Sequence, residues 1–238
     1  MRCAVACALV VPAVLAGAAT SANRSGDGVQ GVLVDPTRFV RAIDNPWFPL
    51  KPGTTFVYVG VEGGEPTRDV VTVTRRTKAI LGVRCVVIRD NVYIAGRLEE
   101  RTTDWYAQDR AGNVWYFGEA TAELDRRGRV KTREGSWEAG VDGAQPGIFM
   151  PARPRVGQAF RQEYYEGHAE DHFRIVSLSA RVKVPHVSSR RAMATVEWTP
   201  LEPGVRDSKY YVRGVGLVKD ERIGGGSDRL VLTAVKKG

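Results

Sequence analysis

The densest group of side chains that could ligate a metal or transfer a proton lies in residues 163–172, which hold Glu163 and two of the three histidines. His168 and His172 are four residues apart, and on a helix this spacing would place both on one face, as in some zinc sites. Gly167 and the β-prone sequence around it indicate strands instead, in which residues four apart lie roughly 13 Å from each other. We therefore expect a solvated hairpin tip, with no metal and no other cofactor; a metal-assisted enzyme using this segment is kept as an alternative.

The rest of the chain shows no sequence pattern typical of a catalytic nucleophile. Cys85 lies in the apolar run 83–88 and has no base next to it in sequence, which is typical of a buried strand thiol. No Gly-x-Ser-x-Gly motif of a serine hydrolase is present. Gly214 and Gly216 lack the third glycine of a dinucleotide-binding loop. Carboxylates such as Asp104 are assigned by default to turns and the surface, so we expect no catalytic residue and favour a protein that is not an enzyme.

Aromatic side chains are concentrated in residues 104–119, which read as a β-hairpin with a polar loop at 108–113. Side chains alternate between the two faces of a strand, so Asp104 and Tyr106 should face opposite to the tryptophan between them. A second apolar group, residues 148–150, follows later in the sequence. A lipid-like or other apolar ligand is the partner that we expect, and the candidate ligand-binding residues are Trp105, Trp115, Phe117, Ile148, Phe149 and Met150. The alternative is that these side chains only form the core.

Most of the chain shows the two-residue alternation and regularly spaced turns of β-strands. We therefore predict an all-β fold, a curved antiparallel sheet that forms a half-barrel or a sandwich. One short N-terminal helix is expected over residues 35–43, and a long loop over residues 139–156, which are rich in glycine and proline.

Two halves of the chain, residues 51–138 and 155–238, resemble each other. The matches keep the same order at a nearly constant separation: Gly53 with Gly157, Phe56 with Phe160, Val71 with Ile175, Val87 with Ala192, Trp105 with Tyr210 and Tyr106 with Tyr211. This pattern predicts an internal duplication within one β-rich domain, residues 35–238. Whether the halves share one sheet or form two domains is left open.

The N-terminus has the features of a secretory signal peptide over residues 1–22. Arg2 precedes an uncharged stretch of small and apolar residues that is short for a membrane-spanning helix. Ala18 stands where a lipoprotein signal would place its cysteine. We therefore expect a soluble exported protein, extracellular or in the cell envelope, without a lipid anchor and with a flexible tail at 23–34.

The formal net charge is +8, from 35 basic and 27 acidic residues. The basic clusters fall at turns and strand ends, and no nucleic-acid recognition motif is present, so nucleic acid is not an expected partner. Weak attraction to anionic envelope surfaces is compatible with the charge. An envelope interaction or scaffold protein that uses a sheet edge is a further alternative to ligand binding.

Three segments carry a resemblance: NPWFPLKPG (45–53), DWYAQDRAGNVWYFGE (104–119) and EAGVDGAQPG (138–147). They resemble a family of uncharacterised secreted bacterial proteins, and this resemblance implies no activity. More distantly, residues 210–218 are similar to the closing hairpin of lipoprotein-carrier-like (LolA-like) half-barrel envelope proteins. That likeness implies a curved antiparallel sheet with a hydrophobic concave side.

Overall fold

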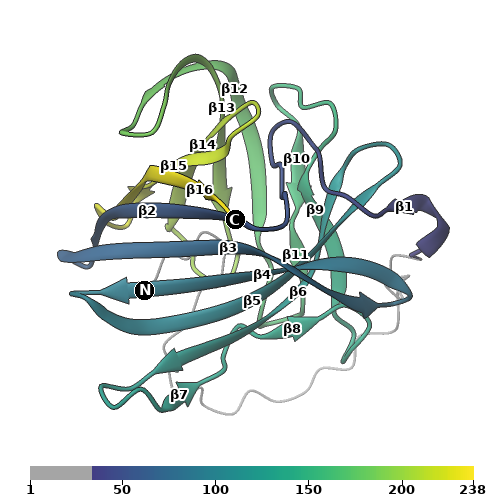
Figure 1. The fold of residues 1–238 in the computed structure, drawn as a ribbon, viewed down its shortest axis with the longest axis horizontal. Coiled ribbons are helices and arrows are strands. Elements are labelled where there is room, and N and C mark those ends of the chain that lie inside the picture. The colour runs from purple at the N-terminus through teal and green to yellow at the C-terminus, as the bar shows by residue number, and fades with distance from the viewer. Residues whose placement is uncertain (1–33) are drawn as a thin grey trace.

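The computed structural model describes residues 34–238, and most of them belong to one 16-stranded antiparallel sheet that curves into a nearly closed barrel (Figure 1). The predicted all-β fold is confirmed. The signal peptide and nearly all of the expected tail lie outside the described residues. No helix within residues 34–238 is both long and apolar enough to cross a bilayer.

The first run of strands is a meander in which each strand pairs with the next. It consists of β2 (Thr54–Glu62), β3 (Glu65–Ile80), β4 (Val83–Ile94), β5 (Arg97–Asp109) and β6 (Val114–Leu124). Alternation sets the faces: Asp69, Val71 and Val73 of β3 are buried, and the residues between them are less so. The hairpin predicted at residues 104–119 is the β5–β6 pair.

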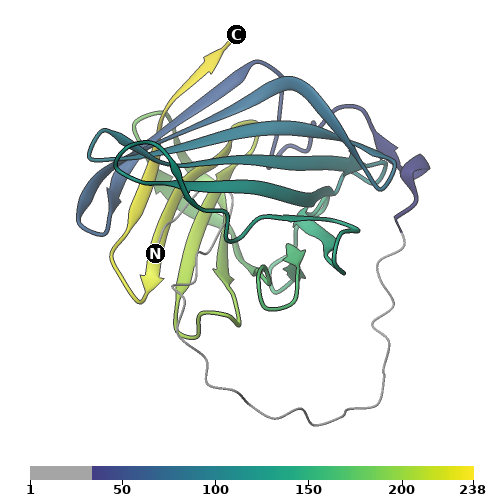
Figure 2. The same cartoon turned by 90° about the horizontal axis from the view of Figure 1, so that it is seen from below.

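The second run repeats this arrangement and closes against the first. It consists of β10 (Ala159–Arg161), β12 (His172–Lys183), β13 (Ser188–Trp198), β14 (Arg206–Val212), β15 (Gly216–Gly224) and β16 (Arg229–Lys237). Figure 2 shows the strands of the first run lying across one side of the barrel, with the second run descending steeply from them.

Two seams join the runs. At one seam β16 pairs with β2. At the other, β9 (Gln145–Met150) pairs with both β6 and β11 (Glu163–Tyr164), while β10 pairs with β12. Since only Gln162 separates β10 from β11, one short segment connects the two ends of the sheet.

The long loop expected over residues 139–156 is wrong, because it contains β9. Pro146 and Gly147 made this segment look irregular, but glycine is required there. A Cβ on Gly147 would lie 2.2 Å from the carbonyl oxygen of Arg161, closer than any real contact.

The expected helix over residues 35–43 is also wrong in extent. Only Pro36–Arg38 is helical, as the 3₁₀ turn η1, and Asp35 caps it by accepting a hydrogen bond from the amide of Thr37. The next residues form β1 (Phe39–Val40), which pairs with β5. The ring of Phe39 contacts those of Trp115 and Phe117, so covering this apolar surface outweighs the local preference for helix. Two further short strands, β7 (Val130–Thr132) and β8 (Trp137–Glu138), pair with β6.

The two runs correspond in backbone detail at their first turn. The amide of Gly53 donates to the carbonyl of Val73 at 2.8 Å, and the amide of Gly157 donates to the carbonyl of Ile175 at 2.8 Å. Both glycines have a positive φ, 89° and 90°. These equivalent turns agree with the internal duplication, which stays a prediction about the origin of the sequence.

Candidate ligand site at one end of the barrel

The aromatic residues of the β5–β6 hairpin divide between the two faces of the sheet. The ammonium of Lys78 lies 3.6 Å from the centre of the Trp105 ring, and Lys78 is part-exposed, so Trp105 faces outward. Trp115 and Phe117 contact Phe39 of the N-terminal segment. These three candidate binding residues therefore support the outer side of the hairpin.

The segment 148–150 is split in the same way. Phe149 packs inside the barrel with its ring centre 4.7 Å from that of Phe48 and 5.0 Å from that of Tyr106. Ile148 is paired with Trp115, and Met150 is buried opposite Val114. The structure thus brings Phe149 to an interior aromatic cluster and places the other five candidates elsewhere.

An inner pocket lies inside the barrel beside this cluster. Its lining combines apolar side chains with two carboxyl groups: Phe48, Pro49, Leu50, Phe56, Tyr58, Val71, Ile88, Asp90, Asp104, Tyr106, Val215, Gly216 and Leu217. None of the six candidates lines it. The pocket is narrow, with about 30 Å³ open to a water-sized molecule. It therefore admits a small group without side-chain movement, and larger groups only with it.

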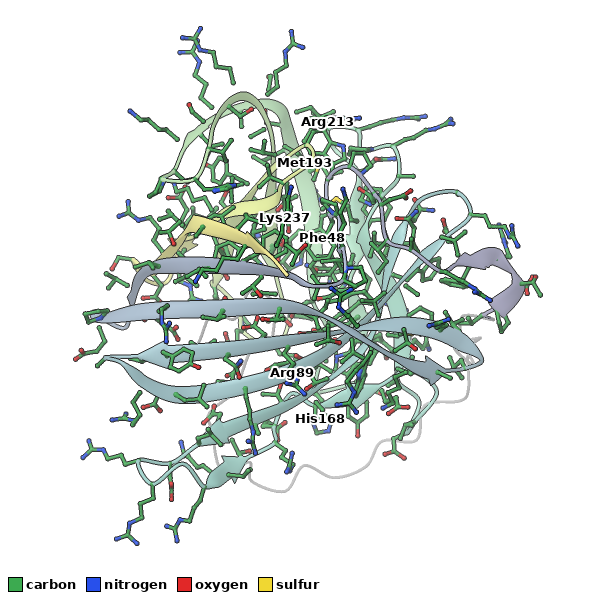
Figure 3. The ribbon with its side chains drawn as sticks, in the orientation of Figure 1. Phe48, Arg89, His168, Met193, Arg213 and Lys237 are labelled. Atoms are coloured by element: carbon green, nitrogen blue, oxygen red, sulfur yellow. The ribbon has the colours of Figure 1, made fainter. Side chains whose placement is uncertain are left out.

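A wider outer pocket adjoins the inner one and has about 330 Å³ open to a water-sized molecule. Pro49, Phe56 and Val215 line both pockets, so the two share part of their walls. Lys51 and Lys237 contribute to the outer pocket. Figure 3 labels Phe48 of the inner pocket and Lys237 of the outer one. The outer pocket is thus apolar at its inner wall and cationic at its rim.

Asp90 and Asp104 form the polar wall of the inner pocket and are almost fully buried, 2 % and 1 % exposed. Asp69, which is 0 % exposed, adjoins this wall through a hydrogen bond with Asp90. Burial is the main reason why the pKa of Asp69 is well above its ordinary value, followed by the charge of Asp90 and a hydrogen bond with it. The raised pKa of Asp69 and the lack of a donor for its two oxygens are both explained if this carboxyl group is protonated. When Asp69 is ionised, neither of its oxygens has a donor, whereas a proton shared with Asp90 supplies one.

The pKa of Asp104 is likewise well above its ordinary value, first because of burial and then because of the charge of Asp90. The hydroxyl of Tyr116 donates to Asp104 Oδ1 at 2.8 Å, which acts in the opposite direction but is weaker than burial. The expectation that Asp104 is a turn or surface carboxylate is therefore wrong.

Glu119 and Glu163 extend this acidic interior, and burial raises the pKa of each well above its ordinary value. Thr121 donates to Glu119 Oε2 at 3.2 Å, and the indole nitrogen of Trp137 donates to Glu163 Oε2 at 2.7 Å. No donor reaches Glu119 Oε1 among the side chains of residues 34–238.

The second run carries buried cations among its carboxylates. Lys209 Nζ lies 2.7 Å from Glu197 Oε2 and 3.9 Å from Asp220 Oδ2, and Lys209 is 1 % exposed. Arg222 Nε lies 3.0 Å from Asp207 Oδ1. The barrel interior therefore combines ion pairs in the second run with neighbouring carboxyl groups in the first.

His168 and His172 line neither pocket, whereas His186 lines the outer one. His168 is exposed, stacks on Tyr165 and lies 3.2 Å from Glu134 Oε1, and His172 stacks on Trp198. Nowhere in residues 34–238 do three or more His, Cys, Asp or Glu side chains gather in a way that could hold a metal ion.

Cys85 is buried, as predicted, and burial raises the pKa of its thiol to about 12. The nearby ammonium of Lys78 opposes this shift without reversing it. The thiol is therefore protonated at neutral pH, and the thiolate needed for nucleophilic attack is scarce.

Comparison with known proteins gives only distant likenesses. No protein-family model and no curated protein matches the chain. One similar solved structure is a candidate exported protein with a YmcC-like fold from Bacteroides fragilis NCTC 9343, 15% identical, with a TM-score of 0.46, covering 80% of this chain and 99% of that one. Another is a candidate lipoprotein from Parabacteroides distasonis ATCC 8503, 10% identical, with a TM-score of 0.42, covering 81% and 99%.

Proposed function

We propose that this protein is an exported binding module that holds a small amphipathic ligand in the two adjacent pockets at one end of its barrel. The observation that carries the proposal is that the two pockets share Pro49, Phe56 and Val215 in their walls. A site that is concave, mostly apolar and equipped with a few polar groups is the usual form of a small-molecule site.

The two ends of the site favour different parts of such a ligand. Apolar side chains, Phe56 and Val215 among them, would contact its hydrocarbon body. Lys51 and Lys237 at the rim favour an anionic group there, as in a fatty acid. Among the functions considered from the sequence, this is binding of a lipid-like molecule, whereas neither the scaffold nor the metal-enzyme alternative has a comparable observation in its favour.

Val215→Trp tests the site, because Val215 lines both pockets and an indole in its place would take up their space. We expect the parent protein to bind n-octanoate or n-decanoate in isothermal titration calorimetry, and the variant to bind at least tenfold more weakly. Ile223→Trp is the matched control, since Ile223 is 53% exposed on β15. Equal binding by the parent and the Val215 variant would place the ligand elsewhere, and no binding of either acid by the parent would contradict the proposed function.

A separate prediction concerns the N-terminus of the exported protein. If residues 1–22 are a cleaved signal peptide, the protein recovered from a secreting host should begin near Asn23 and carry no lipid, because Ala18 stands where a lipidated cysteine would be needed. Intact-mass measurement of the recovered protein distinguishes the outcomes. A retained leader, or the added mass of a diacylglycerol, would contradict the prediction.

A further inference from the structure

The acidic wall of the inner pocket has a counterpart in the second run of strands, and the strand register identifies it. In the first run, Asp104 pairs with Glu119 and Tyr106 pairs with Tyr116, with a β-bulge between the two pairs. The bulge places one extra residue on β6. It therefore marks a position that can be compared with the other hairpin.

The β14–β15 hairpin has the same irregularity at the same place. Lys209 pairs with Asp220, and Tyr211 pairs with Leu217, again with one extra residue on the second strand. Lys209 thus occupies the position of Asp104, and Asp220 that of Glu119.

The neighbouring strands extend this correspondence. On β4, Ile88 pairs with Asp104, and Asp90 follows two residues later on the same face. On β13, Thr195 pairs with Lys209, and Glu197 follows two residues later. Glu197 therefore corresponds to Asp90.

The two runs thus share a carboxyl framework and differ in their cation. In the second run the framework holds the Lys209 ammonium, 2.7 Å from Glu197 and 3.9 Å from Asp220. In the first run a third carboxyl group, Asp104, takes the place of the lysine. The charges that act most strongly on Asp69 beside it all belong to carboxyl groups: Asp90, Glu100 and Asp104.

We infer that the first-run carboxyl wall, formed by Asp90 and Asp104 and backed by the adjoining Asp69, binds an organic ammonium group that belongs to the ligand. Two observations point to this group. The barrel itself supplies an ammonium at the corresponding place in its second run. In addition, Asp69 is fully buried and, when ionised, has no donor for either oxygen.

Geometry and chemistry favour an ammonium over other cations. Asp90 and Asp104 line the inner pocket, which has room for a small group, about 30 Å³, and shares part of its wall with the outer pocket. An ammonium has three N–H donors and can satisfy several carboxylate oxygens at once. A metal ion is less suitable, because no group of three or more ligands in the described part of the chain is arranged to hold one.

This inference rests on the proposed function and specifies the ligand more closely. The rim lysines Lys51 and Lys237 disfavour the approach of a simple cation, whereas a molecule with an ammonium at one end and an anionic group at the other suits both ends of the site. The class of ligand is therefore an amphipathic zwitterion in which a hydrocarbon chain separates an amine from a carboxylate or phosphate.

Calorimetry with chain-matched pairs tests the inference: 6-aminohexanoate, 8-aminooctanoate and 12-aminododecanoate against the fatty acids of the same lengths. We expect at least one amino acid of this series to bind tenfold or more tightly than its fatty acid. In a merely apolar pocket the added ammonium would instead weaken binding strongly, because it would lose its water without gaining partners.

Two variants at Asp104 make the test specific. Asp104→Lys copies the second run and should abolish the preference for the amino acid over its fatty acid. Asp104→Asn hardly changes the size of the side chain, so it provides a test even if the lysine variant does not fold. It should reduce the preference for the amino acid over its fatty acid at least fivefold.

The outcomes separate the two proposals. If fatty acids bind and no ω-amino acid binds more tightly than its fatty acid, the ammonium site is wrong and the apolar site stands. If neither series binds, both are wrong. If the amino-acid preference survives unchanged in Asp104→Asn, the amine lies outside this wall and the inference is overturned.

Discussion

At pH 8 the Glu119→Gln variant is expected to be more stable than the parent protein. Burial raises the pKa of Glu119 well above its ordinary value, with the charges of Glu163, Asp104 and Glu100 acting in the same direction. At pH 8 the fold must therefore either keep a proton on this carboxyl group or bury its charge, and both cost free energy relative to the unfolded chain. Glutamine removes that cost and can still accept the hydrogen bond from Thr121.

The sign of the pH dependence follows from the raised pKa. A carboxyl group with a higher pKa in the folded state favours folding fully below its unfolded pKa, and this contribution is lost as the pH rises toward the folded pKa. A tenfold difference in acidity between the folded and unfolded states corresponds to about 1.4 kcal/mol of unfolding free energy, or roughly 3–6 °C in Tm for a domain of this size. Asp69, Asp104 and Glu163, whose pKa values are also raised, have the same sign.

Thermal unfolding at pH 5 and pH 8 measures both effects. The parent should melt at a lower temperature at pH 8 than at pH 5, and the advantage of Glu119→Gln should be smaller at pH 5. Glu166→Gln is the control, because Glu166 is exposed. A parent protein that melts higher at pH 8, with no gain from Glu119→Gln, would mean that water or a bound cation reaches this interior.

The sequence predicts the strands well because their signal is local. Alternation over the β5–β6 hairpin places Asp104 and Tyr106 on the face opposite Trp105, as the structure has them. The role of Asp104 was missed because a carboxylate in a strand is exposed by default. One signal was available: in β3, Asp69 has the same parity as the apolar Val71 and Val73, which indicates a carboxyl group on an inward face.

The matched residues of the two halves differ partly in strand register, and the duplication that they predict stays a prediction. Tyr106 and Tyr211 do occupy corresponding positions. Val71, however, corresponds to Phe173, two residues from the match with Ile175, since both pair with the corresponding phenylalanines of β2 and β10.

Turns and bulges differ in length between the two halves. Corresponding residues are therefore not separated by a constant number of positions in the sequence. An even shift keeps the same face of the strand, which is why burial was still predicted.

The pocket was beyond prediction from local patterns. Its wall joins residues 48–50 to residues 215–217, and these meet only because β16 returns to pair with β2. A pattern within one hairpin identifies its aromatic side chains but not which of its faces will be enclosed. None of the six candidate binding residues therefore lines either pocket, and only Phe149 reaches the aromatic cluster beside the inner one.

Closure of the barrel depends on glycine at both seams, so replacing either glycine is expected to lower the stability of the fold strongly. Gly60 lies where β2 pairs with β16, and a Cβ there would be 1.7 Å from the carbonyl oxygen of Arg229. Gly147 has the corresponding problem at the other seam, 2.2 Å from the carbonyl oxygen of Arg161. The obstructing atoms belong to the backbone, so no side-chain rotation relieves the clash and the strands must separate.

Gly60→Ala and Gly147→Ala should therefore each lower the free energy of unfolding by roughly 3–5 kcal/mol, in the range of severe packing defects. Gly63→Ala is the control: its Cβ would have no atom within 4 Å, and only its φ of 58° costs energy, about 1 kcal/mol. Urea unfolding of the three variants measures the difference. Because both seams close one sheet, the two severe variants should each shift a single cooperative transition. If Gly147→Ala instead melted only part of the molecule and left the rest with the parent midpoint, the runs would be separate folding units, and the nearly closed barrel would not behave as one structure.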